Sequence, residues 1–580
     1  MYTNIPSVLI LVSLMKQFNI RYVVASPGTR NTPLVHSIEN DDFFKVYSVV
    51  DERSAGFVAL GMSEELDEPV CVTCTAATAT CNYAPAMKEA YERKIQLVAL
   101  TADQNIQSMF HMEDQCIDQR NMYEGYVKYA VDVPKIRDES DYWYCNRCIN
   151  EAFLELNHNG KGPVQINYHV DYGLEELAVA PVRELPQTRK ITRYYEESIN
   201  WKNMSDALSG KKILVLGGSN LETTGKLKQQ LNVFFDKYDA VLVCDHFANE
   251  RGENILNPAG IGDVWWSEVD KYRPDYIITF GNIFYSTIKY AIGSGEKTKH
   301  WHIAIDGTVN DGFRCLENLF EMTPETFFEN INKHTSFSNN HEFYNVWKEG
   351  IKALKYPELN FTNFNAIMKL SKKIPPNSIV HMSVLDSIRL TNYCELDSNI
   401  ECFANIGADG IDGALSAFLG QARDTTELSF LIIGDLSMIY DMNSLLNKMS
   451  SNVRIFVINN YAGAEFHKNF GLEAIPTLND FIAAGHNTRM KQISELNDFE
   501  YMVATDNQEL DQCIFKFVEN DGKAKILEII TDADTDAKTL KEYWKINTRK
   551  MPVTFKSKCK NAIKKVLGKR GINVIKALKG

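Results

Sequence analysis

Long hydrophobic runs are missing from this sequence of 580 residues. The best apolar candidate, Ser7 to Met15, is much shorter than the roughly 18 residues that a membrane-spanning helix needs. It has no basic flank before it and no small-residue cleavage site after it, which excludes a secretory signal. Cysteine is also scarce, with 12 residues in the chain, which excludes a disulfide scaffold. We therefore expect a cytoplasmic protein with reduced thiols.

Positive charge is scarce over most of the chain and concentrated at one end. The 62 Lys and Arg residues face 75 Asp and Glu residues, a net charge of −13. Residues 551–580 hold nine of these cations and no acidic residue, so residues 1–550 carry −22. This acidic body disfavours a nucleic-acid role, because duplex binding needs a basic face that displaces counterions. The basic tail is either solvated or in contact with an anionic membrane or a protein partner.

The rest of the composition, 44% hydrophobic and 24% charged, is typical of a globular protein with several domains. Short runs rich in Val, Ile and Leu end in Gly, Asp, Asn or Ser, and a helix-like pattern follows each run. This pattern is typical of βα units around parallel sheets. The runs are Tyr22 to Ala25, Val46 to Val50, Gln96 to Leu100, Lys212 to Leu216, Ala240 to Cys244, Tyr276 to Phe280, Ser378 to His381, Phe430 to Ile433 and Arg454 to Ile458.

These runs fall into three groups, which predicts an α/β fold of three doubly wound parallel-sheet domains. Polar, irregular segments near residues 182–200 and 335–360 separate the groups and indicate linkers. The predicted divisions are residues 1–185, residues 186–345, residues 346–545 and a basic tail at residues 546–580.

Ligands of open α/β sheets bind beyond the carboxyl ends of the strands. There, Phe430 to Ile433 is followed by Gly434-Asp-Leu-Ser437 and a helical stretch from Met438 to Lys448. The next run is followed by Asn459-Asn-Tyr-Ala-Gly463. Alone, Asp435 could cap a helix and Asn460 could form a turn. Together, the Asp435 carboxylate, the Asn460 amide oxygen and the Ala462 carbonyl suit Mg²⁺, and the N–H groups near Leu436 suit phosphate.

This Gly-Asp motif with Asn-Asn about 25 residues later resembles the diphosphate-binding motif of thiamine diphosphate (ThDP) enzymes. Those enzymes have a pyrimidine-binding domain, a middle domain and a diphosphate-binding domain, in the order predicted here. Among them, the chain is most similar to the menaquinone-pathway synthases (the MenD family). The matching segments are Ser26-Pro-Gly-Thr-Arg30-Asn-Thr-Pro33, Asp51-Glu-Arg-Ser-Ala-Gly-Phe57, Asn82-Tyr-Ala-Pro85, Leu100-Thr-Ala-Asp103, Gly410-Ile-Asp-Gly413 and Gly434-Asp-Leu-Ser437.

The resemblance implies ThDP and Mg²⁺ as cofactors and decarboxylation of a 2-oxo acid, with 2-oxoglutarate as the first candidate, before carboligation to an acceptor. It makes Glu52 the catalytic carboxylate on the aminopyrimidine ring; by itself Glu52 could be an exposed residue at a helix start. Ile411 matches the apolar residue that bends the cofactor. It further implies that Gly434, Asp435, Leu436, Ser437, Asn460 and Ala462 bind the diphosphate and metal, and that the active site lies between subunits of a homo-oligomer.

The positions that face substrate match the family less well. Arg30, Gln115 and Arg389 match residues that face the 2-oxo acid or the product acids, and guanidinium groups suit carboxylates. Two arginines of the family are replaced by Gln104 and Ile406. A Lys-Arg pair is missing from Asn282 to Ile288, and Glu465 stands where an apolar residue is usual.

An enzyme that binds the dicarboxylate isochorismate is expected to keep its cations, since an unpaired buried carboxylate costs several kcal/mol. We therefore predict an altered acceptor. True menaquinone-pathway activity with isochorismate is the alternative, and a non-catalytic scaffold with this fold is an alternative of another class. Glu465 and His467 form a hypothetical acid/base or hydroxyl-binding pair; equally, they could be exposed residues at a helix start.

Two further patterns have structural interpretations. Cys71-x-x-Cys74 lies in a strand-like run, where residues three apart face opposite sides, so these thiols cannot bind one metal together. We predict buried thiols there and in Cys145-x-x-Cys148. Gly217-Gly-Ser-Asn220 lacks a full dinucleotide-binding motif, so a structural role is favoured in the middle domain.

Overall fold

The computed structural model describes residues 2–170, 184–219, 225–257, 266–282, 292, 297–334, 339–357, 360–446, 450–468 and 471–547. Residues 548–580 of the predicted basic tail, the segment that follows Asn282, and Asn220 lie outside the described residues. The first two residues of the predicted tail, Ile546 and Asn547, belong to helix α22. The chain divides into two compact units. The first comprises Met1–Ser198 and Ile305–Glu321, and the second comprises Ile199–Ala304 and Met322–Gly580. Within the described residues, no helix is long and apolar enough to cross a membrane.

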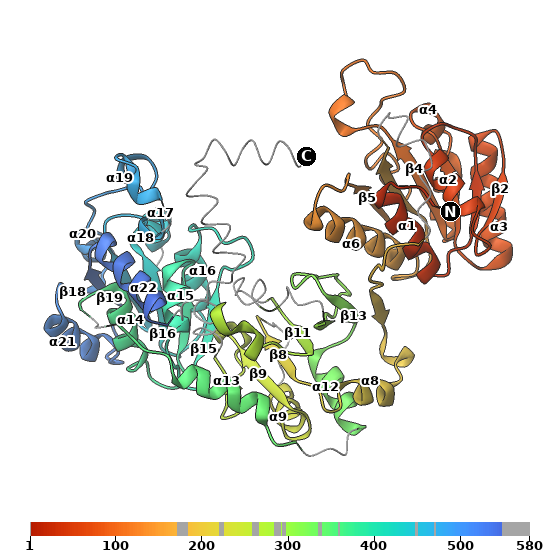
Figure 1. The fold of residues 1–580 in the computed structure, drawn as a ribbon. Helices are drawn as coiled ribbons and strands as arrows, with labels where there is room; N and C mark the ends of the chain where they lie inside the picture. Colours follow the sequence, from red (N-terminus) through yellow and green to blue (C-terminus); the bar gives the residue numbers. More distant parts are fainter. Residues whose placement is uncertain are drawn as a thin grey trace, which may run out of the picture. The chain divides into compact units, whose positions relative to one another are not determined.

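The first unit contains a six-stranded parallel sheet with strand order β2-β1-β3-β4-β6-β5 (Figure 1, red and orange). Its strands are β1 (Tyr22–Ala25), β2 (Lys45–Ser48), β3 (Val70–Cys74), β4 (Leu97–Asp103), β5 (Tyr129–Val133) and β6 (Val164–His169). Its helices are α1 (Pro6–Gln17), α2 (Thr32–Glu39), α3 (Glu52–Leu66), α4 (Thr78–Cys81), α5 (Ala84–Arg93), η1 (Ile106–Ser108) and α6 (Glu139–Glu155). The same unit contains η2 (Glu196–Ser198) and a parallel pair formed by β7 (Thr192–Tyr194) and β13 (Leu316–Phe320).

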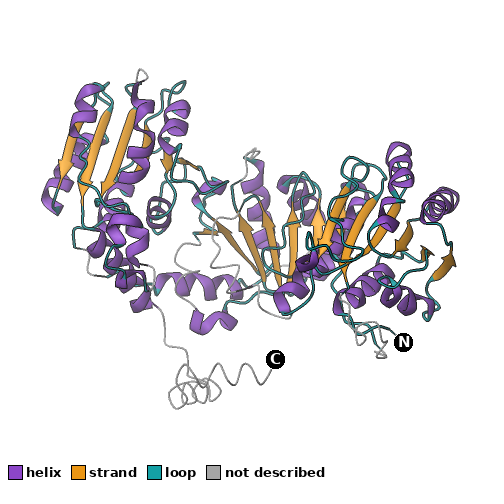
Figure 2. Ribbon diagram, turned by 90° about the horizontal axis from the view of Figure 1, so that it is seen from above, coloured by secondary structure: helices purple, strands orange, loops and turns teal. Residues whose placement is uncertain are grey.

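Strand β4 shows why such short apolar runs become central strands. Leu97 and Ala99 belong to one hydrophobic cluster, whereas Val98 and Leu100 belong to another. Successive side chains of a strand point to opposite faces, so both faces of this sheet are buried, as expected for a parallel sheet. Figure 2 shows helices on both sides of the strands.

The second unit contains two more parallel sheets. In one, the strands follow the order β10-β9-β8-β11-β12, and in the other β15-β14-β16-β17-β19-β18. The strands are β8 (Ile213–Gly217), β9 (Ala240–Cys244), β10 (Ile255–Leu256), β11 (Tyr276–Phe280), β12 (Lys299–Ile303), β14 (Ile379–Met382), β15 (Glu401–Ala404), β16 (Ser429–Gly434), β17 (Val453–Asn459), β18 (Glu500–Ala504) and β19 (Lys525–Ile530).

The helices of the second unit pack around these sheets. In β16, Phe430 and Ile432 join one hydrophobic cluster and Leu431 and Ile433 join another, so the last sheet is also covered on both faces. The helices are α8 (Trp201–Leu208), α9 (Lys226–Lys237), η3 (His246–Ala248), η5 (Trp266–Lys271), α12 (Pro324–Lys333), α13 (Glu342–Lys352), α14 (Asn363–Ser371), α15 (Asp386–Asn392), α16 (Ala414–Gln421), α17 (Asp435–Asp441), η6 (Met442–Leu446), α18 (Ala464–Lys468), η7 (Leu472–Ala474), α19 (Leu478–Phe481), α20 (Lys491–Leu496), α21 (Asn507–Phe517) and α22 (Ala533–Asn547).

The three parallel sheets confirm the predicted α/β fold class. The expectation of an irregular linker over residues 335–360 is wrong in part, because helix α13 occupies Glu342–Lys352. Phe343, Tyr344 and Trp347 are buried on this helix, at helical spacing among charged residues. The helix expected over residues 438–448 begins earlier, at Asp435, and after Asp441 gives way to the 3₁₀ turn η6.

The predicted buried thiols are confirmed. Cys71, Cys74, Cys145 and Cys148 are all buried and free. In the described part of the chain, no group of three or more His, Cys, Asp and Glu side chains is arranged to hold a metal.

Candidate functional site

Strands β16 and β17 bring the two predicted motifs to the same edge of their sheet. They pair in parallel with Gly434 opposite Ile458, so Asp435 and Asn460 emerge side by side. The backbone N–H of Asn460 donates to Asp435 Oδ2 at 3.0 Å, and the N–H of Leu436 donates to Asp435 Oδ1 at 2.7 Å. Both hydrogen bonds hold the carboxylate at the strand ends, as a metal ligand requires.

The side-chain amide nitrogen of Asn460 has a hydrogen-bond partner, whereas its amide oxygen has none among the described residues. Its Nδ2 donates to Asp536 Oδ2 at 3.1 Å. Its Oδ1 is buried, and no described protein group donates to it. Buried polar atoms are nearly always paired, so this oxygen fits a ligand for a cation such as Mg²⁺.

Asp536, at the start of helix α22, orients that amide. It is 2% exposed and also accepts hydrogen bonds from the Thr531 hydroxyl at 2.7 Å and the Asn363 N–H at 2.9 Å. Burial raises the pKa of Asp536 to about 7, although these hydrogen bonds act in the opposite direction. Asp536 was not predictable as a site residue, because nothing in the local sequence links it to Asn460, 76 residues earlier.

Hydrogen bonds of the preceding residue, Asn459, anchor the loop that carries Asn460. Asn459 Nδ2 donates to Glu528 Oε1 at 2.7 Å and to the Thr488 carbonyl at 2.9 Å. Tyr461 lies in the left-handed region with φ of 62°, and its N–H donates to Asn459 Oδ1 at 3.2 Å. A non-glycine residue in this conformation is uncommon and is held by its surroundings. His486 Nε2 lies 3.3 Å from Asp435 Oδ2 on the other side.

A cavity of about 200 Å³ lies against these motifs. A side chain added at Gly434 would project into open space, so the missing Cβ leaves room for a ligand. The chemistry of the lining, which combines the Gly434–Ser437 backbone and the Ser437 hydroxyl with apolar Ile411, fits the diphosphate and ring of ThDP. The predicted cofactor residues that line it are Ile411, Gly434, Asp435, Leu436, Ser437, Asn460 and Ala462.

Four charged side chains form an ion-pair cluster beside this cavity. Arg389 Nη1 lies 2.8 Å from both Asp386 Oδ1 and Glu465 Oε2. Lys468 Nζ lies 2.5 Å from Glu465 Oε2 and also contacts Asp386. Burial opposes ionisation of Asp386, but Lys468 and Arg389 outweigh it and hold the pKa of Asp386 below its usual value.

His467 does not join Glu465, although the two residues are neighbours on helix α18. Its Nδ1 lies 2.7 Å from Asp534 Oδ1 and its Nε2 lies 2.8 Å from Asn479 Oδ1. These groups line a second, polar cavity of about 640 Å³. The structure therefore does not bring Glu465 and His467 together as an acid/base pair.

In the first unit, Glu52 begins helix α3. Asp51 caps the helix by accepting a hydrogen bond from the Ser54 N–H at 2.8 Å, which leaves the Glu52 carboxylate partly exposed at the carboxyl end of β2. Burial and the charge of Glu52 both raise the pKa of the nearby Cys74 thiol above its usual value. The Cys74 thiol, at the end of β3, therefore stays protonated.

Arg30 and Gln115 differ in exposure. Arg30 is 2% exposed, and its Nη1 donates to the Val170 carbonyl at 3.1 Å. Gln115 is exposed, with a positive φ of 53°. Gln104, which stands where the family has arginine, donates from its side chain to the Asp114 carbonyl.

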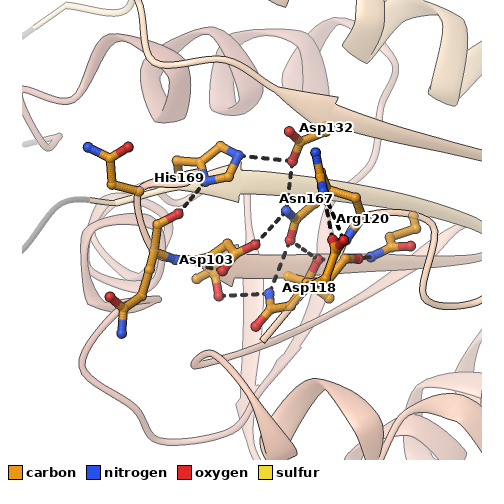
Figure 3. A network of polar contacts seen from close by, with 12 residues as sticks. Asp103, Asp118, Arg120, Asp132, Asn167 and His169 are labelled. Carbon is orange, nitrogen blue, oxygen red and sulfur yellow. Dashed lines mark hydrogen bonds and ion pairs between the residues drawn. The ribbon is translucent and has the colours of Figure 1, made fainter. Parts of the chain in front are cut away.

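A polar network lies at the carboxyl ends of β4, β5 and β6 (Figure 3). Asn167 donates to Asp103 Oδ2 at 2.9 Å and to Asp132 Oδ1 at 2.7 Å. His169 lies 2.9 Å from Asp132 Oδ1 and contacts the Gln104 carbonyl. Burial lowers the pKa of His169, but Asp132 outweighs it and the net shift is upward. The network thereby fixes the backbone of Gln104, whose side chain contacts Asp114, the residue before Gln115.

Comparisons with known proteins extend over nearly the whole chain. The family described as "Thiamine pyrophosphate enzyme, N-terminal TPP binding domain" matches residues 8–122. The chain is 34% identical over 563 residues to the 2-succinyl-5-enolpyruvyl-6-hydroxy-3-cyclohexene-1-carboxylate synthase of Bacteroides fragilis, covering 94% of this chain and 99% of that protein. Identity to the synthases of Phocaeicola vulgatus and Flavobacterium johnsoniae is 33% and 28%, with the same coverage.

Proposed function

Because the chain belongs to the family of 2-succinyl-5-enolpyruvyl-6-hydroxy-3-cyclohexene-1-carboxylate synthases, we propose that it decarboxylates 2-oxoglutarate and transfers the remaining fragment to isochorismate. The resemblance seen in the sequence is confirmed. The chain is an enzyme that depends on ThDP and a divalent metal such as Mg²⁺, decarboxylates a 2-oxo acid and transfers the product. This finding disfavours the non-catalytic scaffold.

The observation that carries the site assignment is the buried, unpaired Asn460 Oδ1 beside Asp435. Asp435, Asn460 and the Ala462 carbonyl hold the metal in this proposal, and the Gly434–Ser437 turn holds the diphosphate. Ile411 would pack against the cofactor from the cavity lining. When bound, ThDP supplies the electron sink for decarboxylation.

Glu52 is the proposed proton-holding group. With ThDP bound, its carboxylate would hold a proton at the aminopyrimidine ring nitrogen. Arg30, Gln115 and Arg389 are the proposed substrate-binding residues, because the two guanidinium groups match a carboxylate in charge and geometry. At Arg389 a substrate carboxylate competes with that of Glu465. The buried position of Arg30 excludes water and strengthens that attraction.

A second candidate keeps the same donor and changes the acceptor. The observation that favours it is the ion-pair cluster, in which Arg389 already contacts Asp386 and Glu465. Gln104 also lacks the positive charge that the family has at this position. An acceptor with hydroxyl groups in place of a carboxylate suits these residues better.

The decisive experiment follows carbon dioxide release by the purified protein with ThDP and Mg²⁺ across a panel of 2-oxo acids. Addition of isochorismate is expected to accelerate turnover of 2-oxoglutarate and to yield the carboligation product. Release without any response to isochorismate would favour the second candidate. No release from any 2-oxo acid would overturn the proposal.

A Glu52→Gln variant tests the assigned role. We expect activity to fall by about 10²-fold or more, since the proton shared with the ring is lost, while ThDP still binds. Activity and calorimetric ThDP binding are measured on the same preparation, with the exposed Glu64→Gln as control. Full activity in Glu52→Gln would contradict the mechanism.

We further infer a homo-oligomer. Apolar side chains around Glu52 are exposed in the single chain, with Val50 at 77%, Phe57 at 43% and Val58 at 42%. Apolar residues gathered beside a catalytic carboxylate are typical of a surface that a partner covers. This supports the prediction that the active site forms between subunits.

A further inference from the structure

In the ion-pair cluster beside the cofactor cavity, the carboxylates line the cavity and the cations do not. Asp386 and Glu465 line the cavity, whereas Arg389 and Lys468 are not among its lining residues. Both cations contact these two carboxylates instead. A substrate in the cavity therefore meets acceptor oxygens before it meets a guanidinium.

The cluster is also balanced in charge. Two carboxylates face two cations, and the Lys468 side chain is only 2% exposed. Glu465 uses both carboxylate oxygens on Arg389, at 2.8 and 3.5 Å, which is the geometry a substrate carboxylate would adopt. From the cavity, a substrate carboxylate that binds Arg389 in this geometry competes with that of Glu465.

We propose that Glu465 is a specificity-determining residue, an internal carboxylate that screens Arg389 and competes with substrate carboxylates for it. This inference rests on the proposed function and deepens it. Glu465 disfavours a carboxylate at this point of the cavity and favours a hydrogen-bond donor, such as a substrate hydroxyl. Replacing Glu465 with an uncharged residue leaves the cluster with a net charge of +1. It also makes the Arg389 guanidinium available to a substrate carboxylate.

The test measures binding of glutarate, a dicarboxylate without a reactive carbonyl, to the enzyme loaded with ThDP and Mg²⁺. We expect Glu465→Gln to bind glutarate about tenfold more tightly than the wild type, since a charged hydrogen bond becomes available. The double variant Glu465→Gln with Arg389→Ala should lose this gain in glutarate affinity. The exposed Glu495→Gln is the matched control and should leave the affinity unchanged.

Turnover supplies a second readout. In Glu465→Gln the KM for a carboxylated substrate should fall by a similar factor, while kcat changes less than threefold. Glu465→Leu, the apolar type usual in the family, repeats the test if Glu465→Gln unfolds, and thermal midpoints identify that case. Glutarate affinity in both variants within twofold of the wild type, or weaker, would overturn the proposal.

The glutarate measurement needs no turnover. An enzyme that releases no carbon dioxide from any 2-oxo acid would defeat the proposed function, yet the comparison of affinities would still decide the role of Glu465. The two failures are therefore distinguishable.

Discussion

At the scale of single residues, Asp536 has the clearest untested role. Its carboxylate fixes the amide of Asn460 so that Oδ1 faces away from all described donors. Residues that orient a metal ligand typically contribute 10- to 100-fold to metal affinity. We expect Asp536→Ala to weaken Mg²⁺ binding by about that factor, measured as the Mg²⁺ concentration that half-saturates calorimetric ThDP binding.

The matched control is Asp532→Ala in the same loop, because Asp532 accepts hydrogen bonds from Thr535 and does not contact Asn460. This variant should keep the Mg²⁺ requirement of the wild type. Equal Mg²⁺ dependence in both variants would show that Asn460 needs no orienting partner.

Residues that follow a buried strand directly were predictable from the sequence. Asp435 and Asn460 lie at adjacent strand ends because parallel strands share one carboxyl edge. The contacts of Asp536 with Asn460 and of Arg389 with Glu465 were not predictable. Each joins residues 76 positions apart, and no local pattern encodes which helix start meets which loop.

At the scale of elements, the 3₁₀ turn η3 carries a histidine that packs in the interior. His246 is 4% exposed, and its Nε2 lies 3.0 Å from the carbonyl of Cys394, two residues beyond the end of α15. Burial, together with the charge of Arg251, lowers the pKa of His246 to about 3. The native state therefore keeps this imidazole neutral where the unfolded chain takes up a proton.

The sign of the pH effect follows from this lowered pKa. The stabilising effect is complete above the unfolded pKa of about 6.5 and is lost as the pH falls toward 3. At pH 4.5 the loss is of the order of 2–3 kcal/mol, and His246→Gln should be free of it. Urea unfolding of the wild type, His246→Gln and the exposed control His36→Gln at pH 7 and 4.5 measures the difference. Identical pH dependence in all three proteins would contradict this role.

Elements buried on both faces were easier to predict than elements buried on one. The run Phe430 to Ile433 is apolar throughout, because both faces of β16 are covered. Helix α13 buries one stripe of aromatic residues between charged ones. Because it contains no continuous apolar run, apolar runs alone do not predict it. Helix periodicity, with Phe343 and Trp347 four residues apart, was the signal that could have revealed it.

At the scale of the whole molecule, the proposed shared active site can be tested by mixing two inactive variants. Glu52→Gln and Asp435→Asn affect different units of the chain. If each site takes Glu52 from one subunit and Asp435 from the other, mixed dimers contain one intact site. An equimolar mixture after subunit exchange should regain about a quarter of wild-type activity.

Two controls complete this experiment. Each variant alone must stay inactive, and mass measurements with a labelled subunit must show that exchange has occurred. No recovered activity after complete exchange would place Glu52 and Asp435 of each site in the same subunit.

The strand order of the last sheet has a consequence for synthesis of the protein. Among the described residues, β18 pairs with β19 alone, and β19, the last of the described strands, lies between β17 and β18. During synthesis, the backbone groups of β17 and β18 that pair with β19 therefore stay unpaired until residues 525–530 leave the ribosome. Open strand edges promote association between chains, and non-local pairing folds slowly. A nascent chain interrupted before Lys525 would be a target for chaperones, even though every proposed catalytic residue is already translated.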